Sequence, residues 1–155
     1  MLSYRKIVLI FLFCFFTYLE GRSYTTTFEG VTSYSMRKNL KNASTLVRYQ
    51  NNPVKSVVSL RYRAESDIPA FLDVLHAYGY YDASITTKVV RGEKKKKYEV
   101  IVQVDLGEQY KINSFNIEGF DMDASDVGIR IGRPAMSQNI VDGRRALLSD
   151  LGDEG

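Results

Sequence analysis

His76 is the residue with the clearest potential for catalysis, because it is the one histidine in the 155-residue sequence. A Ser-His-Asp set would use its imidazole as the base, but no pattern of other residues supports such a set. The one cysteine, Cys14, lies in an apolar run near the N-terminus, which leaves no thiol for a disulfide, a nucleophile or a metal ligand in the rest of the chain. We therefore expect His76 to lie at or near a helix surface, and the chain not to be an enzyme.

Asp121, Asp123 and Asp126 have the residue type that binds calcium. An EF-hand loop that starts at Asp121 needs glycine at its sixth position and glutamate at its twelfth, but Asp126 and Gly132 stand there. The cluster is more typical of a helix start, where the helix dipole favours negative charge. The sequence also contains no glycine-rich phosphate loop. It therefore predicts neither a metal nor a cofactor.

The lysine run Lys94–Lys97 has the charge to bind an anion or a lipid headgroup. It lies between two alternating segments, where exposed lysines protect strand ends from pairing, so we favour a solvated hairpin tip. The net charge of +3 falls to +1 without Arg5, Lys6, Glu20 and Arg22. This near-neutral balance argues against nucleic acid as a partner, because such binding relies on a contiguous basic face.

Residues 1–23 have the order of an export signal. Arg5 and Lys6 precede the apolar run Ile7–Leu19, and small or polar residues follow up to Ser23. The apolar run has 13 residues, against roughly 20 for a membrane-spanning helix, so a permanent anchor is the less favoured alternative. We expect cleavage after Ser23 and an exported mature chain.

Two helical patterns follow a first strand that we expect over residues 24–31. The first predicts a helix from Ser33 to about Asn51. The second is expected to break near Ser66, whose hydroxyl would cap a new helix with Pro69 in its first turn. Gly79 has the place of the left-handed residue that ends a helix. The apolar residues that define the two patterns are Met36, Leu40, Ala43 and Val47, then Val57, Leu60, Ala64, Ile68, Phe71, Leu72 and Leu75.

From residue 83 the apolar period changes from helical to alternating. Segments 83–90 and 98–106 both alternate, which predicts a hairpin. A three-stranded sheet that two helices cover on one face has an open strand edge, to which an extended polypeptide can bind through main-chain hydrogen bonds. The residues that we expect to line such edges are Thr26, Phe28, Thr87 and Val89.

Three segments, in the right order, resemble the POTRA family, the polypeptide-transport-associated modules in the periplasmic arms of outer-membrane barrel proteins. Phe28–Val31 looks like the strand-to-helix entry, and Leu75–Ala83 closely resembles the L-x-A-x-GYY-x-A turn. Asp105–Ile112 is similar to the G-x-x-Y-x-I link into a following module, whose first strand 115–119 would match. The motif residues expected to have structural roles are Gly30, Gly79, Tyr80, Tyr81, Gly107, Tyr110 and Gly119.

The resemblance implies an α+β fold of β-α-α-β-β order, with two helices on one face of a small mixed sheet. It implies a first module over residues 24–110 and an incomplete second copy over 111–155, with no membrane barrel in these residues. TamA-like proteins are the most similar members, while the BamA-like and two-partner secretion members stay open as alternatives.

The implied function is a binding module on the periplasmic side of the outer membrane. The expected partners are unfolded outer-membrane polypeptides, or an inner-membrane or periplasmic assembly subunit. The competing hypothesis is a small secreted enzyme or inhibitor that uses an α/β sandwich.

Overall fold

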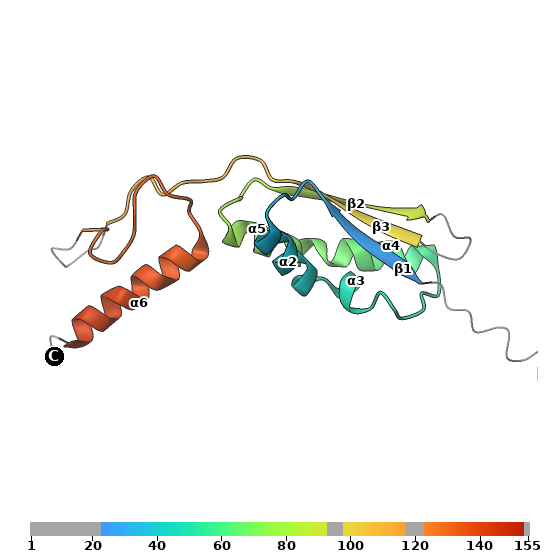
Figure 1. Ribbon diagram of the computed structural model, residues 1–155, viewed down its shortest axis with the longest axis horizontal. Helices are drawn as coiled ribbons and strands as arrows, with labels where there is room; N and C mark the ends of the chain where they lie inside the picture. Colours follow the sequence, from blue (N-terminus) through green and yellow to red (C-terminus); the bar gives the residue numbers. More distant parts are fainter. Residues whose placement is uncertain (1–22, 93–97, 117–122, 154–155) are drawn as a thin grey trace, which may run out of the picture.

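The computed structural model describes residues 23–92, 98–116 and 123–153. The export signal expected over residues 1–23 lies, except for Ser23, outside the described residues, as do the lysine run 94–97 and Gly119. The elements follow one another in the β-α-α-β-β order that the sequence predicts, and each of the two helical segments is split into two, which was expected only for the second (Figure 1). They are β1 (Tyr24–Glu29), α2 (Tyr34–Ala43), α3 (Thr45–Arg48), α4 (Val57–Ser66), α5 (Ile68–Ala77), β2 (Ser84–Arg91), β3 (Tyr98–Asp105) and α6 (Ser137–Asp153).

The three strands form a mixed sheet in the order β1-β3-β2. β3 is central and pairs in parallel with β1 and antiparallel with β2. Helices α2 to α5 lie on one face of the sheet (Figure 1), which confirms the expected α+β class with its helices on one side. Of the helices in the described part of the chain, none is long and apolar enough to span a membrane.

The core lies between this sheet and its helices. Alternate residues of each strand point toward the helices, and Phe28 of β1 meets Phe71 of α5 edge to face, with ring centroids 5.4 Å apart. All members of this buried cluster lie between residues 24 and 104. They are Tyr24, Phe28, Val31, Met36, Leu40, Leu46, Val54, Leu60, Ala64, Phe71, Leu75, Val100, Val102 and Val104.

The sequence predicts a single helix for the first helical pattern. In the structure this helix breaks at Ser44. The backbone of Ser44 is extended, and its hydroxyl accepts a hydrogen bond from the Val47 N–H at 3.1 Å, so that it caps α3. The break rotates the chain, and Leu46 is fully buried while Val47 is only half-buried. The predicted start at Ser33 is confirmed, since its hydroxyl accepts from the Met36 N–H.

The predicted break in the second pattern is confirmed, but its cap is Asp67 and not Ser66. Ser66 is the last residue of α4, and its hydroxyl donates to the carbonyl of Arg63. Asp67 is 2% exposed and makes no side-chain cap of its own helix. Its carboxylate instead accepts hydrogen bonds from Ser44 Oγ at 3.0 Å, Thr45 Oγ1 at 2.6 Å and Leu46 N at 3.0 Å. One buried acid therefore joins the two helix breaks.

The C-terminal segment has a small core of its own. Residues 110–112 pair antiparallel with 132–135 around a bridge between Lys111 and Pro134. Val127 and Ile129 are buried, and Ile129 packs on α6 at Gly143, where an added Cβ would lie 2.7 Å from the Ile129 side chain. Several other apolar side chains of this segment are exposed, namely Phe115, Ile131, Ile140, Val141 and Leu148.

Candidate functional site

The sheet has two open edges, and the hydrogen bonding of β3 decides which backbone groups face them. The Tyr98 N–H donates to the Ser23 carbonyl at 3.2 Å. Because backbone groups alternate sides along a strand, the odd-numbered residues of β1 turn toward β3. The N–H and C=O groups of Thr26 and Phe28 therefore point away from the sheet.

The same alternation fixes the β2 edge. Because the backbone N–H and C=O groups of Tyr98 face β1, those of Glu99, Ile101 and Gln103 face β2. There they pair with the even-numbered residues from Thr86 to Val90. The residues of β2 whose backbone N–H and C=O groups point outward are consequently Ile85, Thr87, Val89 and Arg91. Within the part of the chain that the structure describes, no backbone hydrogen bond engages the outward groups of these residues or of Thr26 and Phe28.

The β1 edge is the more covered of the two. Tyr24 and Phe28 are buried, and α3 packs against the strand. The Tyr24 hydroxyl donates to the Leu46 carbonyl at 2.8 Å and accepts from the Arg63 guanidinium at 3.1 Å. The hydroxyl oxygen of Thr26 is buried without a hydrogen-bond partner among the described residues, so this edge already contains one unsatisfied polar atom.

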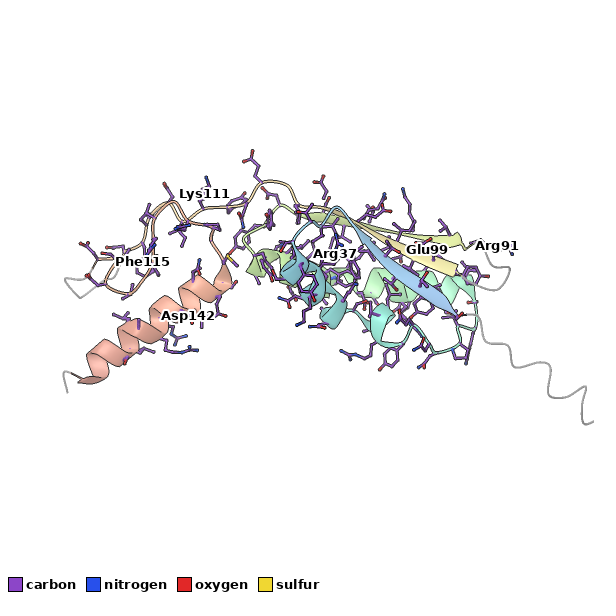
Figure 2. The ribbon with its side chains drawn as sticks, in the orientation of Figure 1. Arg37, Arg91, Glu99, Lys111, Phe115 and Asp142 are labelled. Atoms are coloured by element: carbon purple, nitrogen blue, oxygen red, sulfur yellow. The ribbon has the colours of Figure 1, made fainter. Side chains whose placement is uncertain are left out.

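The β2 edge exposes more side-chain surface. Ile85, Thr87 and Val89 point toward the helices but are only half-buried, because β2 is the last strand on that side. They form a partly apolar strip directly beside the outward backbone groups. Lys88 on the opposite face is exposed. Arg91 at the end of the strand is exposed as well (Figure 2). Sequence reasoning named Thr87 and Val89 but missed Ile85 and Arg91, although the period of two that identified the first pair includes both.

The outer face of the sheet is polar, and no helix or strand of the described residues covers it. Thr27 Oγ1 donates to Glu99 at 2.9 Å, and the Gln103 amide donates to Glu29 at 3.3 Å. These pairs lie across neighbouring strands and place acidic side chains on the face opposite the helices.

Three of the predicted motif residues, Gly79, Tyr81 and Tyr110, lie where the C-terminal segment meets residues 24–105, which form the sheet and its helices. Gly79 has a φ of 86° and ends α5 as expected, with the Tyr80 N–H bonded to the Leu75 carbonyl. The Gly79 carbonyl accepts from the Tyr110 N–H, whose own carbonyl accepts from the Ala135 N–H, both at 2.8 Å. The GYY turn and the following tyrosine link are therefore in direct contact.

Aromatic side chains complete this junction. Tyr81 stacks on His76 with centroids 5.6 Å apart and meets Tyr110 edge to face at 5.5 Å. Its hydroxyl donates to the Ala135 carbonyl at 3.2 Å. The Tyr110 hydroxyl donates to Asp82 at 2.8 Å, and this hydrogen bond to a carboxylate raises the pKa of Tyr110. The sequence motifs indicated the tyrosines, but no spacing signal connects Asp82 with Tyr110.

Gly30 and Gly107 have left-handed backbones, with φ of 82° and 63°. A Cβ added at Gly30 would lie 1.9 Å from the carbonyl oxygen of Val104, so the turn after β1 touches the end of β3. Gly107 has only ordinary contacts, the nearest at 3.6 Å.

The residues that could suggest catalysis or metal binding have structural contacts. In the described ranges, no three histidine, cysteine or acidic side chains come together in a way that could hold a metal. Asp126 accepts a hydrogen bond from the Asp123 N–H at 2.7 Å and so closes a turn, while Asp121 lies outside the described residues. His76 is half-buried against Tyr81.

Comparisons with known proteins give a distant structural likeness. No model of a known protein family matches the sequence, and no characterised protein matches it significantly. The structure is similar to the crystal structure of Haemophilus influenzae BamA POTRA3-5, with 18% sequence identity and a TM-score of 0.42. The match covers 83% of this chain and 49% of that chain, so this chain spans about half of the matched one.

Proposed function

We propose that this chain is a polypeptide-binding module that captures an extended segment along the open edge of β2. The observation that supports it best is the row of outward backbone groups from Ile85 to Arg91, which lie beside a partly exposed apolar strip. Added strands bind mainly through main-chain hydrogen bonds, with little regard for sequence, and the strip offers contacts for alternate side chains. A second edge at Thr26 and Phe28 has the same backbone geometry but a more covered surface.

The strength expected of such capture suits a transient partner. Four backbone hydrogen bonds at a net of roughly 0.5–1.5 kcal/mol each contribute about 2–6 kcal/mol. Association and ordering of the bound segment cost free energy of at least the same order, so binding is weak. A weak, sequence-tolerant edge is appropriate for a module that passes its clients on.

The setting that we propose is the periplasmic side of the outer membrane. Its support is the order of residues 1–23, which is that of an export signal, and the three POTRA-like motifs. In this proposal the module belongs to a TamA-like assembly or translocation factor, and its partners are unfolded outer-membrane polypeptides or an inner-membrane or periplasmic assembly subunit.

A proline substitution at one edge residue tests the proposal. Thr87→Pro removes an outward N–H and is tolerated on an edge strand, whereas Thr87→Val keeps the N–H and the side-chain shape. We would titrate the isotope-labelled chain with an unfolded outer-membrane strand peptide and follow the amide shifts. Shifts at Ile85, Thr87 and Val89 are expected in the native chain and in Thr87→Val, and not in Thr87→Pro.

Further variants and conditions identify the alternatives. Thr26→Pro in place of Thr87→Pro would abolish binding if β1 is the capturing edge. Urea unfolding of each variant separates loss of capture from loss of fold. Shifts confined to Lys94–Lys97, or shifts that disappear in moderate salt, would show electrostatic contact and overturn edge capture.

A further inference from the structure

Positive charge is concentrated in the helices α2, α3 and α4, although the net charge of the chain without residues 1–23 is close to zero. From Val31 to Ala64 the sequence contains seven lysines and arginines and no acidic residue. This stretch comprises α2, α3 and most of α4. The opposite, outer face of the sheet has the acidic side chains Glu29, Glu99 and Asp105 and one exposed cation, Lys88. The two faces of the first module therefore differ in sign.

Exposed apolar and aromatic side chains lie among the cations where α3 meets α4. Val58 and Tyr62 are 73% and 74% exposed and share one face of α4, four residues apart. Tyr49, which ends α3, is 42% exposed and lies under the Arg63 guanidinium at 5.8 Å, next to α4. We call this area the α3–α4 surface; its residues are Arg48, Tyr49, Lys55, Val58, Arg61 and Tyr62.

The three cations of the α3–α4 surface have no ion-pair partner among the described residues. Arg48, Lys55 and Arg61 are exposed, and no ion pair in the described ranges involves any of them; the pair found there joins Arg145 to Asp142 of α6 (Figure 2). A surface of free cations with interspersed tyrosine and aliphatic side chains has the composition of a membrane-interface contact, in which basic residues meet anionic headgroups and apolar residues enter the headgroup boundary.

The α3–α4 surface also adjoins the point where the chain enters the fold. Tyr24, the first residue of β1, is hydrogen-bonded to Leu46 of α3 and Arg63 of α4. In the sequence only Glu20–Ser23 separate Tyr24 from the apolar run Ile7–Leu19. Before the expected cleavage after Ser23, that run would therefore lie four residues from the start of β1, next to this surface.

From these observations we infer that the α3–α4 surface binds an anionic lipid bilayer. Nucleic acid is the less favoured partner, because bases stack on aromatic rings but gain nothing comparable from an exposed valine. Such binding would turn the helices toward the membrane and leave the acidic face of the sheet toward the solvent. It does not depend on the proposed polypeptide capture, which uses the strand edge.

The test places the isotope-labelled full chain in bicelles that contain a headgroup spin label, made of phosphatidylcholine with or without phosphatidylglycerol. Paramagnetic broadening of each amide signal then reports which face lies near the headgroups. With phosphatidylglycerol, we expect broadening at Lys55, Arg61 and Tyr62, and little at Thr25 and Lys88 on the opposite face. Without it, broadening at the α3–α4 surface should be lost even if residues 1–22 hold the chain on the bicelle.

Paired variants show whether this surface or total charge is responsible. Each cation near an anionic surface strengthens binding by roughly fivefold, so Lys55→Gln with Arg61→Gln should weaken it about 25-fold. Broadening at Tyr62 should then fall to its level in neutral bicelles. Arg130→Gln with Arg144→Gln, which removes two exposed arginines of the C-terminal segment, should leave it unchanged.

Three results would overturn the inference. They are equal broadening in the two lipid compositions, strongest broadening at Thr25 and Lys88, and equal losses in the two double variants. A single-stranded oligonucleotide that shifts the amides of the α3–α4 surface, while anionic bicelles do not broaden them, would assign the surface to nucleic acid instead. All four substituted positions are exposed, so an unchanged spectrum elsewhere verifies the fold.

Discussion

Replacing Gly30 by alanine should destabilise the sheet and its helices, residues 24–105. The loss should exceed the cost of placing an L-residue in a left-handed backbone conformation. The Cβ of the new residue would lie 1.9 Å from the Val104 carbonyl oxygen, 3.0 Å from its carbonyl carbon and 3.6 Å from its Cα. All three contacting atoms belong to the backbone of residue 104, so no change of side-chain rotamer relieves the clash. The turn after β1 and the end of β3 would have to separate instead, in a region where Phe28 and Val104 are buried.

The magnitude follows from three contributions. A left-handed backbone costs an L-residue roughly 1–2 kcal/mol. Forcing extra volume into a packed contact costs roughly 1–3 kcal/mol more, and the reduced freedom of the unfolded chain offsets roughly 0.4–1 kcal/mol. The expected loss in the free energy of unfolding is therefore about 1–5 kcal/mol, a large share of the ~5–15 kcal/mol that stabilises a typical domain.

Gly107→Ala is the matched control, because Gly107 also has a positive φ but its nearest neighbour would be 3.6 Å away. The Gly107→Ala variant should lose about 1 kcal/mol of unfolding free energy, which is the cost of the left-handed backbone alone. Urea unfolding followed by circular dichroism measures both variants at constant m-value. Equal losses in the two variants, or a smaller loss at Gly30, would refute the steric argument.

Three further substitutions and one proteolysis experiment have outcomes that the structure predicts. Asp67→Ala leaves the Ser44 and Thr45 hydroxyls and the Leu46 N–H without their acceptor and should cost about 3–5 kcal/mol in urea unfolding; the exposed Asp73→Ala on α5 should cost less than about 0.5 kcal/mol, and similar values would contradict the proposed clamp. Thr26→Val removes a buried hydroxyl without a partner and should raise the unfolding free energy by about 1 kcal/mol, so a loss would mean that the hydroxyl has a partner, such as water. Asp82→Asn should lower the pKa of Tyr110 toward its ordinary value in an ultraviolet absorbance titration; because the folded-state pKa is the raised one, the stabilisation from this contact is present below the unfolded-state pKa and is lost as the pH rises through the folded-state pKa. Limited proteolysis should cut residues 123–153 before residues 24–104, which contain the main buried cluster, and equal resistance along the chain would contradict a boundary near residue 110.

The sequence predicted the type and order of the elements from their apolar periods. Ser33 and Gly79 were identified because a helix start and a left-handed helix end each favour a few residue types. The break at Ser44 was not predicted, since Met36, Leu40, Ala43 and Val47 continue a helical spacing through it. The break depends on Asp67, 23 residues later in the sequence, and such long-range hydrogen bonds leave no periodic signal.

The candidate site was predictable only in part. The alternation of β2 indicated which residues share a face, and Thr26, Phe28, Thr87 and Val89 do lie on edge strands with their N–H groups outward. The sequence did not predict that β1 pairs with β3, because parallel pairing of distant strands depends on the tertiary fold. The greater coverage of the β1 edge likewise depends on the contacts of Tyr24 with α3 and α4.

The parallel pairing of β1 with β3 also has a kinetic consequence. Tyr24 pairs with Tyr98, a separation of 98 − 24 = 74 residues, so the first strand has no sheet partner until nearly the whole unit has been synthesised. Contacts of high sequence separation slow folding, because the intervening loop must be ordered before the pairing is rewarded. The hairpin of β2 and β3 is local and can form first, after which β1 adds to its free side. The β1 edge of the sheet is therefore completed only after most residues of the unit have been synthesised.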